Sequence, residues 1–471
     1  MTTFKHRTLV LAVVSALTIS ACGSGSGSGT AASKVTGVIT GFGSVFVNGV
    51  EYETTSSSVS MEGTSGSESD LKLGMVVTLD GSVNADGKTG KATHIDYADE
   101  LEGIVSAVNI AADGTGTLTV MGQTVKVDAA TKFESKVSTI TSIDMLVANN
   151  IVEVSGYSAG DGTIYATRVE LKKSAMASGD EIEVKGVVAA VDTTAHTFMI
   201  GSQMVDYSGA QLEGFASGAP TNDTFVEVKS TAGIVNSILI ANKVEVEGDG
   251  KKGIDGKSGE KVELEGVVNS IVSATEFVLN GQHVLLDNGT EFEHGSAADI
   301  AVDVKLEVKG KLDADGKLLA DEVKFRSEGN IEMRGLVSAI DTTASTITVL
   351  GVQVKINNLT QMGDERDENG AMPVRYFSIN DLAAGDLVKL HVYVDTANAL
   401  VATQMERDDA TTSEVKLEGP VSSVNGTQVV IAGVTVELTG LAVTPAVGDK
   451  LEVRGSYANN LLTATSATID N

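Results

Sequence analysis

Cys22 is the residue whose surroundings most clearly indicate a chemical modification. It closes the stretch 19–22 (Ile-Ser-Ala-Cys), which fits the bacterial lipobox, where small residues precede a cysteine that becomes acylated. The basic residues at 5–7 and the apolar run at 9–17 precede it, and that run is too short for a permanent membrane span. Since the chain has one cysteine, we expect residues 1–21 to be a lipoprotein signal peptide and Cys22 to be lipidated. The alternative is an ordinary secretory leader.

The residues after Cys22 predict how the chain is held at a membrane. Gly23 rather than Asp follows the cysteine, which in Gram-negative bacteria resembles the pattern that permits transport to the outer membrane. Residues 22–33 are rich in Gly and Ser and predict a flexible tether that reaches about 15 Å. We therefore expect the membrane to be a partner through the N-terminal lipid, with the periplasmic or outer face left open.

One local cluster of a cation and two aromatic side chains could bind a ligand. Arg375, Tyr376 and Phe377 lie in an enlarged loop at 363–377, and loops on a rigid scaffold often carry function. We therefore name these residues as a candidate ligand loop. The alternative is that the loop is a tolerated insertion without a binding role.

The remaining reactive side chains do not form a recognisable constellation in the sequence. None of the six histidines pairs at a metal-ligand spacing, and we interpret His283 and His294, near Glu291 and Glu293, as turn and strand surface. The runs at 84–87 and 313–316 resemble the start of a calcium loop but predict hairpin turns, with weak calcium contact as the alternative. We therefore predict no enzyme, and no catalytic residue, cofactor or metal site.

The formal net charge of −29 bears on the class of partner. An acidic surface repels phosphate backbones, and from this charge we expect no nucleic-acid partner. We interpret the acidity as serving solubility, with loose binding of divalent cations as the alternative. An envelope protein or a polysaccharide is left open as a partner.

A repeated pattern of glycines and alternating strands positions all these residues. Each copy opens on an apolar-polar alternation that we expect to end in a glycine. These glycines are Gly37, Gly103, Gly186, Gly266, Gly335 and Gly419. A second glycine follows between strand-like runs and predicts a hairpin turn. The second glycines are Gly49, Gly122, Gly201, Gly281, Gly351 and Gly433.

The later part of each copy predicts a short helical turn and two more strands. In four copies an aspartate with an apolar neighbour predicts a cap for a single helical turn. These aspartates are Asp70, Asp144, Asp299 and Asp381. Five or six short strands in about seventy residues match a closed barrel, because an open sheet of that size leaves edges free to pair. The sequence therefore predicts an all-β fold with about six small OB-like (Greek-key) β-barrels in tandem.

The repeat resembles the tandem bacterial family catalogued as domain of unknown function DUF5666, which occurs in secreted lipoproteins. The resemblance spans roughly residues 35 to 470 and implies small β-barrels, with no known activity and no functional residues to carry over. The domains that we expect are barrels at 34–99, 100–173, 180–247, 261–327, 330–408 and 413–471, with a linker at 248–260. We predict a bent rod whose loosest joint lies near residue 254, because the linker combines glycine with charge.

These observations favour a lipid-anchored cell-envelope protein that acts as a non-enzymatic scaffold or adhesion module, since repetition supplies length and multivalency. The alternative is a binding protein for a small ligand, glycan or divalent cation, with the loop 363–377 as its site.

Overall fold

The computed structural model describes residues 32–470 except 112–113, 160, 248–252, 255, 328, 367–375 and 410–413. The signal peptide, Cys22, the tether, part of the predicted linker, and Arg375 therefore lie outside the described residues. No helix in the described ranges is long and apolar enough to cross a membrane. The described chain is built from strands and four single 3-10 turns, and it confirms the predicted all-β class of small barrels.

The strands group into six barrels, which we number in chain order. Barrel 1 contains β1 (Ala32–Phe42), β2 (Val45–Val47), β3 (Val50–Glu53), β4 (Ser58–Met61), β5 (Thr64–Gly66), the 3-10 turn η1 (Glu68–Asp70), β6 (Val76–Val83) and β7 (Thr89–Tyr97). Barrel 2 contains β8 (Leu101–Ile110), β9 (Gly116–Val120), β10 (Gln123–Val127), β11 (Lys132–Ser135), η2 (Ile143–Met145), β12 (Ile151–Ser158) and β13 (Ile164–Lys173). Barrel 3 contains β14 (Ile182–Asp192), β15 (Thr197–Ile200), β16 (Gln203–Asp206), β17 (Gln211–Glu213), β18 (Phe225–Ser230), β19 (Ile234–Val235), β20 (Ile238–Ile240) and β21 (Lys243–Val246).

The second half of the chain repeats this arrangement. Barrel 4 contains β22 (Lys261–Ser273), β23 (Glu276–Leu279), β24 (Gln282–Leu285), β25 (Glu291–Glu293), η3 (Ala297–Asp299), β26 (Lys305–Leu312) and β27 (Leu318–Phe325). Barrel 5 contains β28 (Ile331–Asp341), β29 (Thr346–Val349), β30 (Val352–Lys355), β31 (Gln361–Asp364), η4 (Ile379–Asp381), β32 (Leu387–Val394) and β33 (Leu400–Asp408). Barrel 6 contains β34 (Val415–Asn425), β35 (Gln428–Ile431), β36 (Val434–Glu437), β37 (Lys450–Ala458) and β38 (Leu461–Asp470).

Each barrel closes through one strand order, which barrel 2 illustrates. β8 pairs with β9, β9 with β10, β10 with β13 in parallel, β13 with β12, and β12 with β8 again. If β8, β9, β10, β12 and β13 are numbered 1 to 5, the order around the barrel is 1-2-3-5-4-1, which is the Greek-key order of an OB-like barrel. In barrel 3 the strand that corresponds to β13 is split into β20 and β21. Closure removes the free edges that a small open sheet would present.

The two repeated glycines act together in the structure. Met121 and Gly122 form the β9–β10 turn with φ of 48° and 72°, as a type I′ turn requires. This turn folds the Met121 side chain over Gly103, where an added Cβ would overlap it. The opening glycine therefore makes room for the side chain of the turn. It does not end the strand as predicted, because β8 continues from Leu101 to Ile110.

The predicted aspartate cap is placed differently in the structure. In η1 the N-cap residue is Ser67, and Asp70 lies at the end of the turn, where its carboxylate accepts a hydrogen bond from the Ser67 backbone N–H at 2.9 Å. The same capping box recurs with Ser296 and Asp299 and with Ser378 and Asp381. Three of the four predicted aspartates therefore cap by reaching back to a preceding serine, as in the serine–acid boxes of helix termini. Asp144 instead lies in the middle of η2, which follows Ser142 without such a box.

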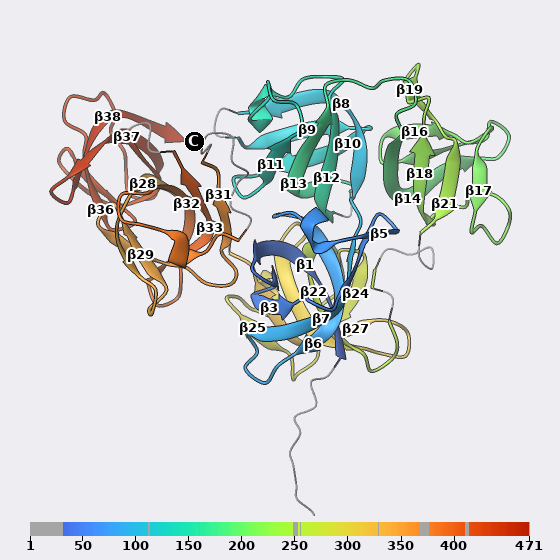
Figure 1. Ribbon diagram of the computed structural model, residues 1–471, viewed down its shortest axis with the longest axis horizontal. Coiled ribbons are helices and arrows are strands. Elements are labelled where there is room, and N and C mark those ends of the chain that lie inside the picture. The colour runs from blue at the N-terminus through green and yellow to red at the C-terminus, as the bar shows by residue number, and fades with distance from the viewer. Residues whose placement is uncertain are drawn as a thin grey trace, which may run out of the picture.

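The barrels are not arranged as the predicted bent rod. The first strands of the barrels pair with one another: β1 with β22 in parallel, β8 with β14, and β28 with β34. Barrels 1 and 4 therefore share a sheet although two barrels separate them in sequence. Figure 1 shows these two at the centre, with barrel 2 above them, barrel 3 at one side, and barrels 5 and 6 at the other.

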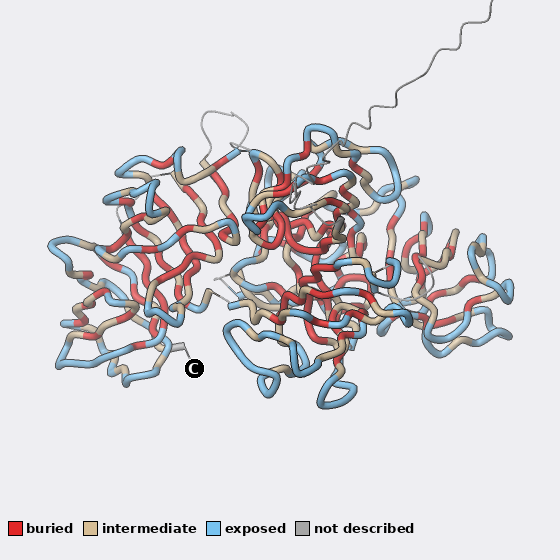
Figure 2. The backbone as a smooth tube through the Cα atoms, turned by 90° about the horizontal axis from the view of Figure 1, so that it is seen from below, coloured by how far each residue is buried: buried red, intermediate tan, exposed pale blue. Residues whose placement is uncertain are grey.

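Two of these pairs of barrels also share an apolar core. Barrels 2 and 3 share one continuous cluster of buried side chains, and barrels 5 and 6 share another. Barrels 1 and 4 keep separate cores, but Val38, Tyr157 and Val267 form a small cluster where barrels 1, 2 and 4 meet. Figure 2 shows buried residues along the strands and exposed ones on the loops. Packing between barrels therefore adds to the core of each one.

Adding a Cβ at position 103 tests the contact between Gly103 and the Met121 side chain. Gly103→Ala is expected to lower the stability of barrels 2 and 3 by about 1–3 kcal/mol, the usual cost of overpacking. Gly209→Ala is the control, since a Cβ there has no neighbour within 4 Å. Calorimetry measures both variants, and an equal effect at the two positions contradicts the contact.

Candidate functional site

A cavity lies where barrels 1, 2, 4 and 5 meet, with a volume of about 280 Å³. Its lining includes Val38 of β1, Thr167 of β13, Glu265 of β22 and His391 of β32. Four barrels thus contribute to one partly open space, which is lined by strands and loops from each of them. We regard this four-barrel cavity as the main candidate functional site.

Contacts between barrels close the space around the four-barrel cavity. Thr40 Oγ1 donates to the Asn358 carbonyl at 3.0 Å, which joins barrels 1 and 5. Thr167 Oγ1 donates to the Gly74 carbonyl at 2.6 Å, which joins barrels 2 and 1. Lys132 of barrel 2 pairs with Glu365 of barrel 5 at 3.1 Å. The cavity wall is therefore held by polar contacts as well as by shared strands.

Glu265 is the buried acid of the cavity. Its carboxylate accepts hydrogen bonds from Tyr157 Oη at 3.2 Å and Arg326 Nη2 at 3.2 Å, and it pairs with Lys305 Nζ at 2.9 Å. Burial acts to raise the pKa of Glu265, but Lys305 and Arg326 outweigh it and lower that pKa. Arg326 also pairs with Glu307. The charges on this wall are therefore neutralised by one another.

His391 is the buried imidazole of the cavity, with 3 % of its surface exposed. Its Nε2 has no hydrogen-bond partner among the described residues, and the same is true of Arg326 Nε. Burial, together with repulsion from Lys389, lowers the pKa of His391 to about 4. The ring is therefore neutral at physiological pH, and two buried nitrogens beside the cavity lack a partner there.

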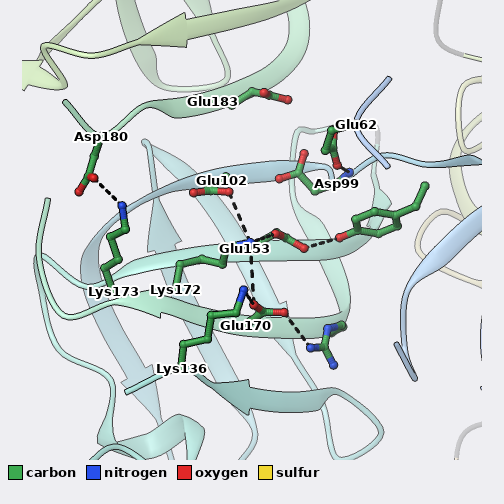
Figure 3. Close-up of polar contacts among 12 residues, drawn as sticks. Glu62, Asp99, Glu102, Lys136, Glu153, Glu170, Lys172, Lys173, Asp180 and Glu183 are labelled. Atoms are coloured by element: carbon green, nitrogen blue, oxygen red, sulfur yellow. Dashed lines mark hydrogen bonds and ion pairs between the residues drawn. The ribbon is translucent and has the colours of Figure 1, made fainter. Parts of the chain in front are cut away.

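A second concentration of titratable groups lies where barrels 1, 2 and 3 meet. Glu62, Asp99 and Glu183 each place a carboxylate oxygen within 4.8 Å of the others, and Figure 3 shows them converging from different segments. Lys185 Nζ lies 3.0 Å from Glu62, 3.1 Å from Asp99 and 2.9 Å from Glu183. The lysine ammonium therefore occupies the position that a cation bound by these three carboxylates would take.

Further ion pairs continue from this junction into barrel 2. Tyr97 of barrel 1 donates to Glu153 at 2.6 Å, and Lys172 pairs with Glu153. Figure 3 shows the contact between Lys172 and Glu153. Arg168 binds Glu170 at 2.9 Å and the Leu73 carbonyl of barrel 1 at 3.3 Å. These side chains hold barrels 1 and 2 together, which is a structural use of buried charge.

The candidate ligand loop is only partly described. Phe377 is buried at 4 % exposure, and the Arg407 guanidinium carbon lies 4.5 Å from its ring centroid. Tyr376 is exposed, and Arg375 lies outside the described residues. The structure therefore separates the two aromatic side chains that we predicted to act together, because Phe377 packs into the core of barrel 5.

Of the other candidate residues, all but His294 lie in ordinary surface contacts or turns. His283 Nδ1 lies 2.8 Å from Glu276, while His294 lines the four-barrel cavity. Asp313 Oδ1 accepts hydrogen bonds from the backbone N–H groups of Asp315 and Lys317, as expected for a hairpin turn. The sequence signal that we missed is the charged residue before the opening glycine, such as Lys185 or Glu265, which recurs in five copies.

Comparison with protein families finds one match. A family model described as "Domain of unknown function (DUF5666)" matches residues 34–96, 102–170, 265–324, 334–406 and 418–467. These stretches cover well over half of the chain and fall in barrels 1, 2, 4, 5 and 6. The search of curated proteins gives no match.

One of the similar solved structures is described as a multidomain protein with nucleic acid binding domains from Streptococcus pneumoniae TIGR4. It is 10 % identical, covers 43 % of this chain and 72 % of its own, and has a TM-score of 0.12. Our expectation of no nucleic-acid partner is contradicted by this comparison and is withdrawn, since net charge alone does not select a partner class. At this TM-score the likeness supports no conclusion about what the chain binds.

The junction of barrels 1 to 3 depends on Lys185. Lys185→Met is expected to destabilise the protein by about 3–5 kcal/mol, because it leaves buried carboxylates without their counter-charge. Thermal unfolding measures the loss, and Lys88→Met, at an exposed hairpin position, is the matched control. Asp99→Asn added to Lys185→Met should recover part of the loss; a double variant no more stable than the single one contradicts the assignment.

Glu227 and Glu183 predict a pH dependence of stability. Burial and the adjacent Glu183 carboxylate raise the pKa of Glu227 to about 8. The folded chain therefore keeps a proton on Glu227 that the unfolded chain releases at the ordinary glutamate pKa of 4.5. The stability that this proton contributes is complete below pH 4.5 and is lost as the pH rises to about 8.

Glu227→Gln removes this titration and keeps a hydrogen-bond donor. The variant is expected to gain stability relative to the unaltered chain as the pH rises from about 5 to about 9, measured as Tm. Glu181→Gln, at an exposed position, is the control. An identical pH profile for the unaltered chain and Glu227→Gln contradicts the raised pKa.

Proposed function

The chain belongs to the family of domain of unknown function DUF5666, and we propose that it is a lipid-anchored, non-enzymatic scaffold of the bacterial cell envelope. The single observation that carries this proposal is the placement of buried charge at the contacts between barrels. Lys185, Lys132 and Lys416 each pair with carboxylates at such a contact. Buried ionisable groups are used here to fix barrel against barrel.

Shared strands support a rigid scaffold in the same way. Where two barrels pair through their first strands, the backbone hydrogen bonds of one continue into the other. Lys416 of barrel 6 then binds Glu332 of barrel 5 at 2.8 Å across the β28–β34 pair. A pair joined by backbone and by a buried ion pair resists bending more than two domains on a linker. The repeated barrels therefore supply a broad, rigid surface.

Lipidation of Cys22 supplies the anchor in this proposal. The acyl chains of a lipoprotein hold it at a bilayer, since each buried methylene contributes about 0.8 kcal/mol and several chains act together. Gly23 and the residues that follow form a short spacer, which keeps the barrels near the surface of the membrane. The proposed location is the outer membrane.

Membrane attachment tests the anchor directly. Cys22→Ser is expected to move the protein from the membrane fraction to the soluble fraction and to abolish labelling by a radioactive fatty acid. Ser24→Ala keeps the cysteine and serves as the control, and Gly23→Asp should shift the chain toward the inner membrane. Retention of the Cys22→Ser chain in the outer-membrane fraction refutes the lipid anchor.

A further inference from the structure

The four-barrel cavity has a buried floor and an accessible rim. The floor includes Glu265, Gln361 and His391, all buried, while Asp128 and Ala130 of barrel 2 and Asn330 of barrel 5 lie at exposed positions around it. The cavity volume of about 280 Å³ is near the lower end of the range for small-molecule sites. A ligand the size of one or two sugar rings therefore has a way in and a space to fill.

The charged groups of the cavity are already occupied by one another. Lys305 and Arg326 pair with Glu265. Lys324 pairs with Glu293 at 3.0 Å. Asp128 Oδ1 accepts from the Ala130 backbone N–H at 2.9 Å. Little net charge remains to attract an ion, and an anion would also face the carboxylates of Glu265 and Asp128.

Apart from the two histidines, the other polar side chains of the lining are neutral amides and hydroxyls. They include Asn330, Asn357, Gln361, Tyr393 and Thr403. Amides and hydroxyls both donate and accept hydrogen bonds, and so do the hydroxyl groups of a sugar. Phe325 and Tyr393 add aromatic surface, on which the apolar face of a sugar ring can pack. The lining therefore matches a neutral polyhydroxylated molecule.

The unpartnered nitrogens on the cavity wall favour the same class of ligand. Arg326 Nε is a donor that needs an acceptor, and the neutral His391 Nε2 either donates or accepts according to its tautomer. Leaving buried polar atoms without partners costs about 1–3 kcal/mol each. A hydroxyl group suits either nitrogen, because its oxygen accepts and its proton donates.

We propose that the four-barrel cavity binds a neutral monosaccharide or disaccharide. This function goes beyond the scaffold and does not depend on it. The sugar enters past Ala130 and Asn330 and places hydroxyl groups against the buried wall near His391 and Arg326. Binding of this kind also links the four barrels through one ligand.

The test is calorimetric titration of the mature chain in a detergent without a sugar headgroup. The probes are glucose, galactose, N-acetylglucosamine, maltose and lactose, with glucose 6-phosphate and galacturonate as anionic comparators. At least one neutral probe is expected to bind and the anionic ones to bind more weakly. Failure of every neutral probe at concentrations of tens of millimolar, or preference for the anionic ones, overturns the proposal.

Two variants place the binding in the cavity. Ala130→Trp fills the rim and is expected to abolish binding. Ala195→Trp is the matched control, since both alanines are exposed and each donates its backbone N–H to an aspartate two or three residues earlier at 2.9 Å. Unchanged affinity in Ala130→Trp overturns the assignment to this cavity.

His391→Leu separates a binding role from a structural one. Because His391 Nε2 has no partner among the described residues, its removal is expected to leave Tm unchanged or raised while it weakens sugar binding roughly tenfold, the size of one hydrogen bond to a buried group. Equal affinity in His391→Leu shows that the histidine takes no part. A loss of both Tm and affinity assigns it to the fold and contradicts its place in the site.

Discussion

The arrangement of the six barrels depends on buried cations surrounded by carboxylates. The sequence carries a formal charge of −29, and the carboxylates of Glu62, Asp99 and Glu183 meet at one contact between barrels. Lys185 supplies a positive charge between the carboxylates of barrels 1, 2 and 3, and Lys416 does the same between barrels 5 and 6. A buried ion pair adds little net stability, but removal of one partner is costly. The lysines therefore determine which surfaces can meet.

Much of each barrel could be predicted from the sequence because its signals are local. Alternation with period two gives the strands, and the pair of glycines gives the first hairpin. The joint role of Gly103 and Met121 could not be predicted, since a turn residue folds back over the strand only in three dimensions. Three of the four predicted aspartates do cap a helical turn, but from its last position and together with the serine three residues earlier, which is the N-cap.

Which barrel surfaces pack against one another could not be predicted from the sequence, and the cause is physical. A charged residue on the outward face of a strand has the same sequence pattern whether it meets water or another barrel. Glu265 and Lys185 follow the alternation of any half-exposed strand, yet both are buried at junctions. The four-barrel cavity has no motif of its own, because its residues come from four copies. Tyr376 and Phe377 are neighbours in an enlarged loop of the sequence, but only Phe377 is buried.

The parallel pairing of β1 with β22 has a consequence for how this chain matures. A polypeptide is synthesised from the amino end, so β1 is made well before its neighbour β22 in barrel 4. During that interval residues 33–36 of β1 lack the strand that will pair with them, and another strand can add there. A nascent chain of this topology needs a holding partner, or fast synthesis of its middle third, to avoid pairing with other copies of itself.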